Sequence, residues 1–247
     1  MSSMTSELHT LERARIRWFV WPREHGAWGI LLVPLVTGAW VGFTSGDRIG
    51  PVLLLAVASL ALFCLRTPVE ALLETSPVRA QTPAERRVAW YSIAVYVALA
   101  SVTLGALLWR ERAYGLLLLG GAVALAFVAQ AVLKKFRRQS RMAAQLIGAL
   151  GLTSTAAAAY YVVTGEIDLR ACVLWVVNWL FAANQIHFVQ LRIHAARAAS
   201  RVEKLARGKA FLAGEIITTA LLALAWRFQV LPGVATLAFG PALVRGV

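Results

Sequence analysis

The sequence predicts an all-α bundle of about eight membrane-spanning helices, and three observations point to it. The chain is 59% hydrophobic and 15% charged, with a mean hydropathy of +0.67, whereas soluble domains are about a quarter charged. Eight apolar runs are long enough, or nearly so, to cross a bilayer. The basic residues gather in alternate gaps between these runs. The runs are residues 27–43, 51–65, 88–108, 114–133, 143–163, 169–190, 209–226 and 228–244.

The distribution of Lys and Arg predicts the orientation of the chain. Twenty of the 25 lie in the N-terminal segment, in the second, fourth and sixth gaps, or in the C-terminal tail. Basic residues are enriched on the cytosolic side of membrane proteins. We therefore expect both termini to be cytosolic. The opposite gaps hold the other five: Arg48, Arg110, Arg112, Arg170 and Arg227.

The chain divides into a cytosolic segment, residues 1–24, and a single transmembrane domain, residues 25–247. Residues 6–21 mix arginines with large apolar side chains, a composition typical of an interfacial helix. His25 and Gly26 lead into the first run, which begins with Ala27, Trp28 and Gly29. Membrane anchoring accounts for Trp28, but it accounts poorly for His25, which we take as a candidate catalytic residue.

Two copies of a Thr-Pro-x-Glu pattern, at residues 67–70 and 82–85, predict helix starts. Thr suits the N-cap, Pro the first helical position and Glu the third, where its side chain returns a hydrogen bond. We expect the first copy to begin a short helix near residues 68–75. The second copy should lead into the third span.

The densest polar group lies at the cytosolic end of the sixth span. At helical spacing, Asn184, His187, Gln190 and His194 share one face. His187 and His194 are candidates for proton transfer or metal ligation, and Asn184 and Gln190 for substrate binding. The alternative is that the imidazoles only make interhelical hydrogen bonds near the interface.

Three glutamates are further candidates. Glu70 and Glu74 form an E-x-x-x-E pair, which on one helical face could hold Mg²⁺ or support acid–base catalysis. The alternative is that Glu70 completes a capping box and Glu74 faces water. Glu215 lies within the seventh run, where a charge is costly, so it should face the bundle interior. We expect its partner to be a cationic or histidine side chain on the sixth helix, or else a helix–helix hydrogen bond of the protonated acid.

The net charge of +13 is explained by the membrane rather than by nucleic acid. Basic residues beside membrane ends meet anionic lipid headgroups, so membrane lipids are the expected partners and nucleic acid is not. No cofactor or metal is indicated, although a divalent ion is compatible with the polar residues. The fourth gap is the basic segment best placed to bind a phosphate or headgroup, through Lys134, Lys135, Arg137 and Arg138.

The P-x-x-H-G-A-W stretch at residues 22–28, the block at 141–161 and the helix end at 178–192 together resemble the YwiC-like family of bacterial membrane proteins. More remotely, the chain is similar to UbiA-type intramembrane prenyltransferases, which have catalytic loops after the second and sixth spans and a basic segment after the fourth. That resemblance implies a similar architecture and, for an enzyme, a prenyltransferase-like reaction. The chain departs from it by lacking the two aspartate-rich Mg²⁺ clusters.

Three functions remain open on the sequence alone. The first is binding or modification of an isoprenoid or lipid at a cytosol-facing polar cavity. The second is transport of a small solute, which would depend on Glu215. The third is a non-catalytic membrane component that assists a partner complex.

Overall fold

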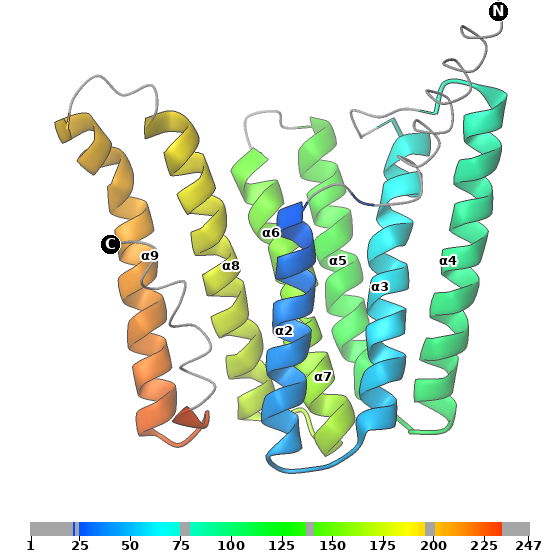
Figure 1. Ribbon diagram of the computed structural model, residues 1–247, viewed down its shortest axis with the longest axis horizontal. Helices are drawn as coiled ribbons and strands as arrows, with labels where there is room; N and C mark the ends of the chain where they lie inside the picture. The colour runs from blue at the N-terminus through cyan, green and yellow to red at the C-terminus, as the bar shows by residue number, and fades with distance from the viewer. Residues whose placement is uncertain (1–21, 23–24, 75–79, 137–140, 196–200, 234–247) are drawn as a thin grey trace, which may run out of the picture. The chain divides into compact units, whose positions relative to one another are not determined.

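The computed structural model describes residues 22, 25–74, 80–136, 141–195 and 201–233, and within them the regular structure is helical, with no strand (Figure 1). This confirms the all-α class for the described residues. The chain forms two compact units, one made of Met1–Gly29 with Leu53–Arg112 and the other of Ile30–Val52 with Ala113–Val247. The helices are α2 (His25–Phe43), α3 (Ile49–Leu72), α4 (Pro83–Trp109), α5 (Gly115–Phe136), α6 (Arg141–Thr153), α7 (Thr155–Thr164), α8 (Leu169–Ala195) and α9 (Arg201–Arg227).

Six helical segments of the described chain are long and apolar enough to cross a membrane, and they match the first six predicted runs one for one. The seventh run, 209–226, is helical and belongs to the 27-residue α9; its crossing of the membrane stays a prediction. The interfacial helix at 6–21 and most of the eighth run, 228–244, lie outside the described residues. The six segments are Gly26–Phe43, Ile49–Leu72, Pro83–Trp109, Gly115–Leu133, Met142–Thr164 and Leu169–Gln190.

The first of the two expected helix starts is wrong. α3 runs without a break from Ile49 to Leu72 and carries Pro68 inside it, so residue 67 caps nothing and no separate helix begins there. A proline near the end of a helix removes one backbone hydrogen bond, and an apolar span that is already formed tolerates that loss. The Glu70 side chain accepts a hydrogen bond at 2.9 Å from Nε of Arg66, one turn earlier.

The second helix start is confirmed. Thr82 has extended backbone angles and its hydroxyl accepts the Glu85 N–H at 3.2 Å, while the Glu85 carboxylate accepts the Thr82 N–H at 3.0 Å. These two reciprocal bonds form a capping box, and Pro83 occupies the first helical turn. The buried Glu85 therefore has a structural role at the start of α4.

The fifth run is one span made of two helices, which the sequence did not predict. α6 and α7 meet at Ser154, whose backbone stays in the right-handed helical region, so the interruption is slight. Three successive hydroxyls surround it and each donates to a carbonyl three or four residues earlier. Such back-bonding bends helices and partners the carbonyls that the bend exposes. The pairs are Thr153 with Ala149 at 2.9 Å, Ser154 with Gly151 at 2.7 Å, and Thr155 with Leu152 at 2.9 Å.

Two tryptophans of α8 bind the backbone of α6. The indole N–H of Trp175 donates to the Leu150 carbonyl at 2.9 Å, and that of Trp179 donates to the Leu146 carbonyl at 3.0 Å. Both the donors and the acceptors are four residues apart, one turn on each helix. The Leu150 carbonyl is the one that would accept the Ser154 N–H in an uninterrupted helix, so Trp175 supports the point where α6 ends.

Small residues bring α2 and α7 into close contact within the second unit. Gly38, Gly42 and Gly46 recur every four residues and line one side of α2 and the turn after it. A Cβ on Gly38 would overlap the backbone carbonyl of Ala156, and a Cβ on Gly42 would lie 2.9 Å from the Val163 side chain. Glycines at this spacing let membrane helices approach until their backbones touch.

Buried polar side chains join the same helices. Thr155 of α7 donates to the Leu31 carbonyl of α2 at 3.2 Å. Asn178 of α8 is 1% exposed; its amide donates to the Leu174 carbonyl at 2.8 Å, and its oxygen accepts from Thr37 of α2 at 3.4 Å. Each polar group in this core thus has a partner on its own or a neighbouring helix.

We predict that Gly38→Ala lowers the stability of the protein by about 3 kcal/mol, because the added methyl meets backbone rather than a side chain that could rotate away. The measurement is the apparent melting temperature in mild detergent. The matched control is Gly120→Ala in α5, where nothing lies within 4 Å of the added Cβ. Equal melting temperatures for the two variants would contradict the close α2–α7 contact.

Candidate functional site

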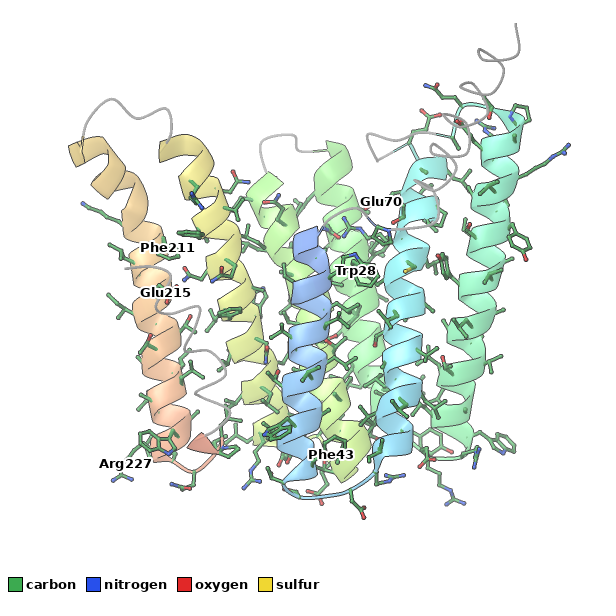
Figure 2. The ribbon with its side chains drawn as sticks, viewed as in Figure 1. Trp28, Phe43, Glu70, Phe211, Glu215 and Arg227 are labelled. Atoms are coloured by element: carbon green, nitrogen blue, oxygen red, sulfur yellow. The ribbon has the colours of Figure 1, made fainter. Side chains whose placement is uncertain are left out.

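α8 and α9 pack antiparallel in a fixed register that three contacts define. Val177 packs against Leu222 in one buried cluster. Asn184 lies seven residues after Val177 on α8. It contacts Glu215, which lies seven residues before Leu222 on α9. Phe188 lies four residues after Asn184, and Phe211 lies four residues before Glu215; the centres of their rings are 5.3 Å apart. Along the helix pair, the contact between Asn184 and Glu215 therefore lies between two apolar contacts. Figure 2 shows Phe211 and Glu215 following one another along α9.

The polar centre of this helix pair is a hydrogen bond from Asn184 Nδ2 to Glu215 Oε1, at 2.5 Å. Asn184 is 4% exposed and Glu215 is partly buried. Gly214 makes the contact possible, because a Cβ at that position would lie 2.5 Å from Asn184 Oδ1. The sequence predicted the right helix for the partner of Glu215. The partner is an amide rather than the cation or histidine that was expected first, and the contact is a helix–helix hydrogen bond, as in the alternative.

The Asn184 oxygen is the one buried side-chain polar atom without a hydrogen-bond partner in the described structure. Burying an acceptor without a donor costs about 1–3 kcal/mol, so native proteins rarely leave one. This unpartnered acceptor beside a carboxylate is therefore the candidate binding site of the helix pair.

The helical backbone that the predicted polar face of α8 requires is confirmed. α8 is helical from Leu169 to Ala195, so Asn184, His187, Gln190 and His194 do share one side. His187 and Gln190 are partly buried, and the side chain of His194 lies outside the described set. Asn184 bonds Glu215 on the neighbouring helix. A shared role of the two histidines stays a prediction.

The end of the pair toward the α8–α9 connection carries positive charge. The Arg192 guanidinium lies 6.0 Å from the centre of the Phe188 ring, within range of a cation–π contact. Arg192 and Lys209 are both exposed. Moving along the helix pair, cationic groups therefore give way to an aromatic pair and then to the Asn184–Glu215 contact.

The predicted pairing of Glu70 with Glu74 on one helical face is wrong. α3 ends at Leu72, and Glu74 lies in the following turn with a φ of 55°, in the left-handed region. The backbone leaves the right-handed helical conformation after Leu72, so the four-residue spacing no longer places the two side chains on one helical face. Glu70 instead bonds Arg66 on its own helix.

Several predicted site residues fall outside the described set. The backbone of His25 begins α2, but its side chain is not described, and the same holds for Lys134 and Lys135 at the end of α5. Arg137 and Arg138 lie wholly outside it. Their roles stay predictions. Among the residues that the structure does describe, no three His, Cys, Asp or Glu side chains gather closely enough to hold a metal ion.

Sequence reasoning missed Gly214 and its contact with Asn184. The available signal was the Gly-Glu dipeptide inside the predicted seventh span, since a glycine next to a helical acid gives a neighbouring side chain room to reach the carboxylate. It also missed the two indole bonds from α8 to α6, which depend on how the helices rotate about their axes.

Six segments of the described residues are long and apolar enough to cross a membrane, and in a chain this apolar they define a multi-pass membrane protein. The comparison with family models matches residues 21–160 to the YwiC-like protein family. That is more than half of the chain, and the chain belongs to the YwiC-like family. No curated protein and no solved structure matched. The matched residues end before α8, so the Asn184–Glu215 contact lies outside them.

We predict that Gly214→Ala destabilises the protein by about 1–2 kcal/mol, because the new methyl displaces the buried Asn184 amide. In an Asn184→Ala background the same change should stabilise the protein by about 0.5–1 kcal/mol, the usual gain from replacing a helical glycine. Melting temperatures of the four proteins in one detergent check this. The same sign of effect in both backgrounds would contradict the contact.

Proposed function

We propose that this protein binds an isoprenoid or a lipid, with the polar head of the ligand held between α8 and α9 near their cytosolic ends. The observation that carries the proposal is the unpartnered, buried oxygen of Asn184 beside the Glu215 carboxylate. A ligand head that donates a hydrogen bond there would remove the cost of burying that oxygen.

The surroundings of this contact suit an amphiphile. Glu215 lies six residues after Lys209, about 9 Å along the helix axis. α9 exposes Leu212 one turn before Glu215 and Ile216 directly after it, apolar side chains that a lipid tail can cover. Arg192 and Lys209 at the cytosolic end can meet an anionic part of a headgroup. An amphiphile would contact the polar pair, the apolar side chains and the cationic end, whereas a small polar solute would not contact the apolar side chains.

The proposal concerns binding. Prenyl transfer of the UbiA type uses two acidic clusters around Mg²⁺, and the carboxylates of Glu70 and Glu74 do not lie on one helical face. His187, partly buried and one turn from Asn184, is the described side chain best placed to move a proton if the bound ligand is also modified.

We further propose that the protein lies in the bacterial cytoplasmic membrane with both termini in the cytosol. The support is the distribution of Lys and Arg, twenty of which fall on one side of the predicted topology. The α8–α9 connection and the basic end of the pair then face the cytosol, where anionic lipids attract cations.

The orientation predicts which residues a membrane-impermeant maleimide reaches in spheroplasts. In a background with Cys64 and Cys172 replaced by Ser, Glu166→Cys in the α7–α8 turn should be labelled without permeabilisation. Ala84→Cys at the start of α4 is the matched control and should be labelled only after permeabilisation; both positions are exposed. The reverse pattern would contradict the orientation.

The binding proposal predicts a lipid that stays with the protein through purification in mild detergent. In the Asn184→Leu/Glu215→Leu variant the amount of that lipid, measured by mass spectrometry, should fall at least about tenfold, the effect of losing one strong hydrogen bond. Replacing both partners leaves no orphaned polar atom, so this variant should fold. Glu166→Leu, which alters an exposed loop glutamate, should retain the lipid.

An unchanged lipid content in the double leucine variant would contradict binding at this place. A second candidate, a small-solute carrier, is favoured by the carboxylate of Glu215 inside an apolar helix. Under that candidate, solute flux into vesicles should depend on Glu215 and should not depend on Glu166.

A further inference from the structure

We propose that the α8–α9 pair recognises a protonated primary amine, which donates hydrogen bonds to Asn184 Oδ1 and to the Glu215 carboxylate. The inference rests on the proposed function and names the chemical class of the ligand's head. It narrows the proposed ligand to an amphiphile whose head carries an ammonium group. Basic residues alone would instead suggest that a phosphate is the recognised group.

The first argument is the inventory of donors and acceptors. Asn184 Nδ2 already donates to Glu215 Oε1, and no other bond to the Glu215 carboxylate is formed by described residues. What remains are acceptors, namely Asn184 Oδ1 and the second carboxylate oxygen. A phosphate or a carbonyl offers only further acceptors. A group with several N–H bonds in different directions satisfies both oxygens at once.

The second argument is charge. An ionised carboxylate inside a membrane helix is costly unless a positive charge lies beside it. Within the described part of the chain, no cationic side chain forms an ion pair with Glu215. Arg192 is engaged with the Phe188 ring, two helical turns along α8 from Asn184, and Lys209 is exposed to the surroundings. A ligand with one positive charge would neutralise this site.

The third argument separates an amine from a metal ion. Divalent ions in proteins take six or more oxygen ligands, or four when nitrogen and sulfur contribute. Here a single carboxylate and a single amide oxygen are available, and the described residues contain no cluster of three metal-binding side chains. Two acceptors suit an ammonium group, which needs directional partners and leaves its third N–H for water or for its own phosphate.

The amine has two possible sources, a lipid headgroup such as ethanolamine or a small soluble amine. The test uses the full chain purified in mild detergent and a methylation series of one lipid. The series runs from phosphatidylethanolamine through its N-methyl and N,N-dimethyl forms to phosphatidylcholine. Charge and tails stay the same while the number of N–H donors falls from three to none, so the series needs no protein variant.

We expect affinity, measured by native mass spectrometry, to fall along the series by about tenfold overall, which corresponds to losing a hydrogen bond to a charged group. Glu215→Gln keeps an acceptor for Asn184 but removes the charge, and it should flatten the series. Glu166→Gln is the matched control and should leave the series unchanged. Melting curves establish that each variant is folded.

A second arm replaces the lipids by ethanolamine, with choline as the control that lacks N–H donors. Stabilisation of wild type by ethanolamine, but not by choline, would support the amine site with a soluble ligand and would favour the carrier. Preference for ethanolamine lipid with no effect of the soluble amine would support it with a lipid ligand.

Three outcomes would overturn the inference. Equal binding of all four lipids would show that a lipid binds but that its amine is not recognised, leaving the proposed function intact. A methylation series that persists in Glu215→Gln would place amine recognition elsewhere. No response to any lipid or soluble amine would remove the inference and the proposed function together.

Discussion

The hydrogen bond between Asn184 and Glu215 is the contact on which the arrangement of α8 and α9 depends. Asn184 is 4% exposed and Glu215 is partly buried, so each group needs a partner within the protein and finds it on the neighbouring helix. Apolar residues above and below would pack in several registers, but only one register brings the amide to the carboxylate over Gly214. A polar pair of this kind specifies register more strictly than it adds stability, since such bonds contribute only about 0.6 kcal/mol on average.

The same constraint explains features elsewhere in the second unit. The interruption at Ser154 frees backbone carbonyls in a region with no water, and hydroxyls together with the indole of Trp175 take up those acceptors. Gly38 contributes differently, by letting α2 approach the backbone of Ala156 closely enough for dispersion contacts to hold the helices. Against this pattern of satisfied groups, the Asn184 oxygen is an exception, and such an exception in a native protein needs a specific explanation, which the proposed ligand supplies.

Local features of the fold were predictable from the sequence, and features that depend on helix rotation were not. The apolar runs and the capping box at Thr82 follow from residue order alone, because their partners are a few residues apart. The same Thr-Pro-x-Glu pattern failed at residues 67–70, because there it continues an apolar helix that is already formed. For the site, sequence placed Glu215 against the sixth helix but could not choose Asn184, since the choice depends on the register of two helices.

The most direct test of this account is a double-mutant cycle on Asn184 and Glu215, with Leu at each position and unfolding followed in mixed detergent micelles. Each single variant leaves a polar group unpartnered in an apolar setting, whereas the double variant leaves none. The account predicts that the double variant is less destabilised than the sum of the singles, by about 0.6–1.7 kcal/mol. Additive effects would contradict it, because they would mean that the two side chains do not meet in the membrane.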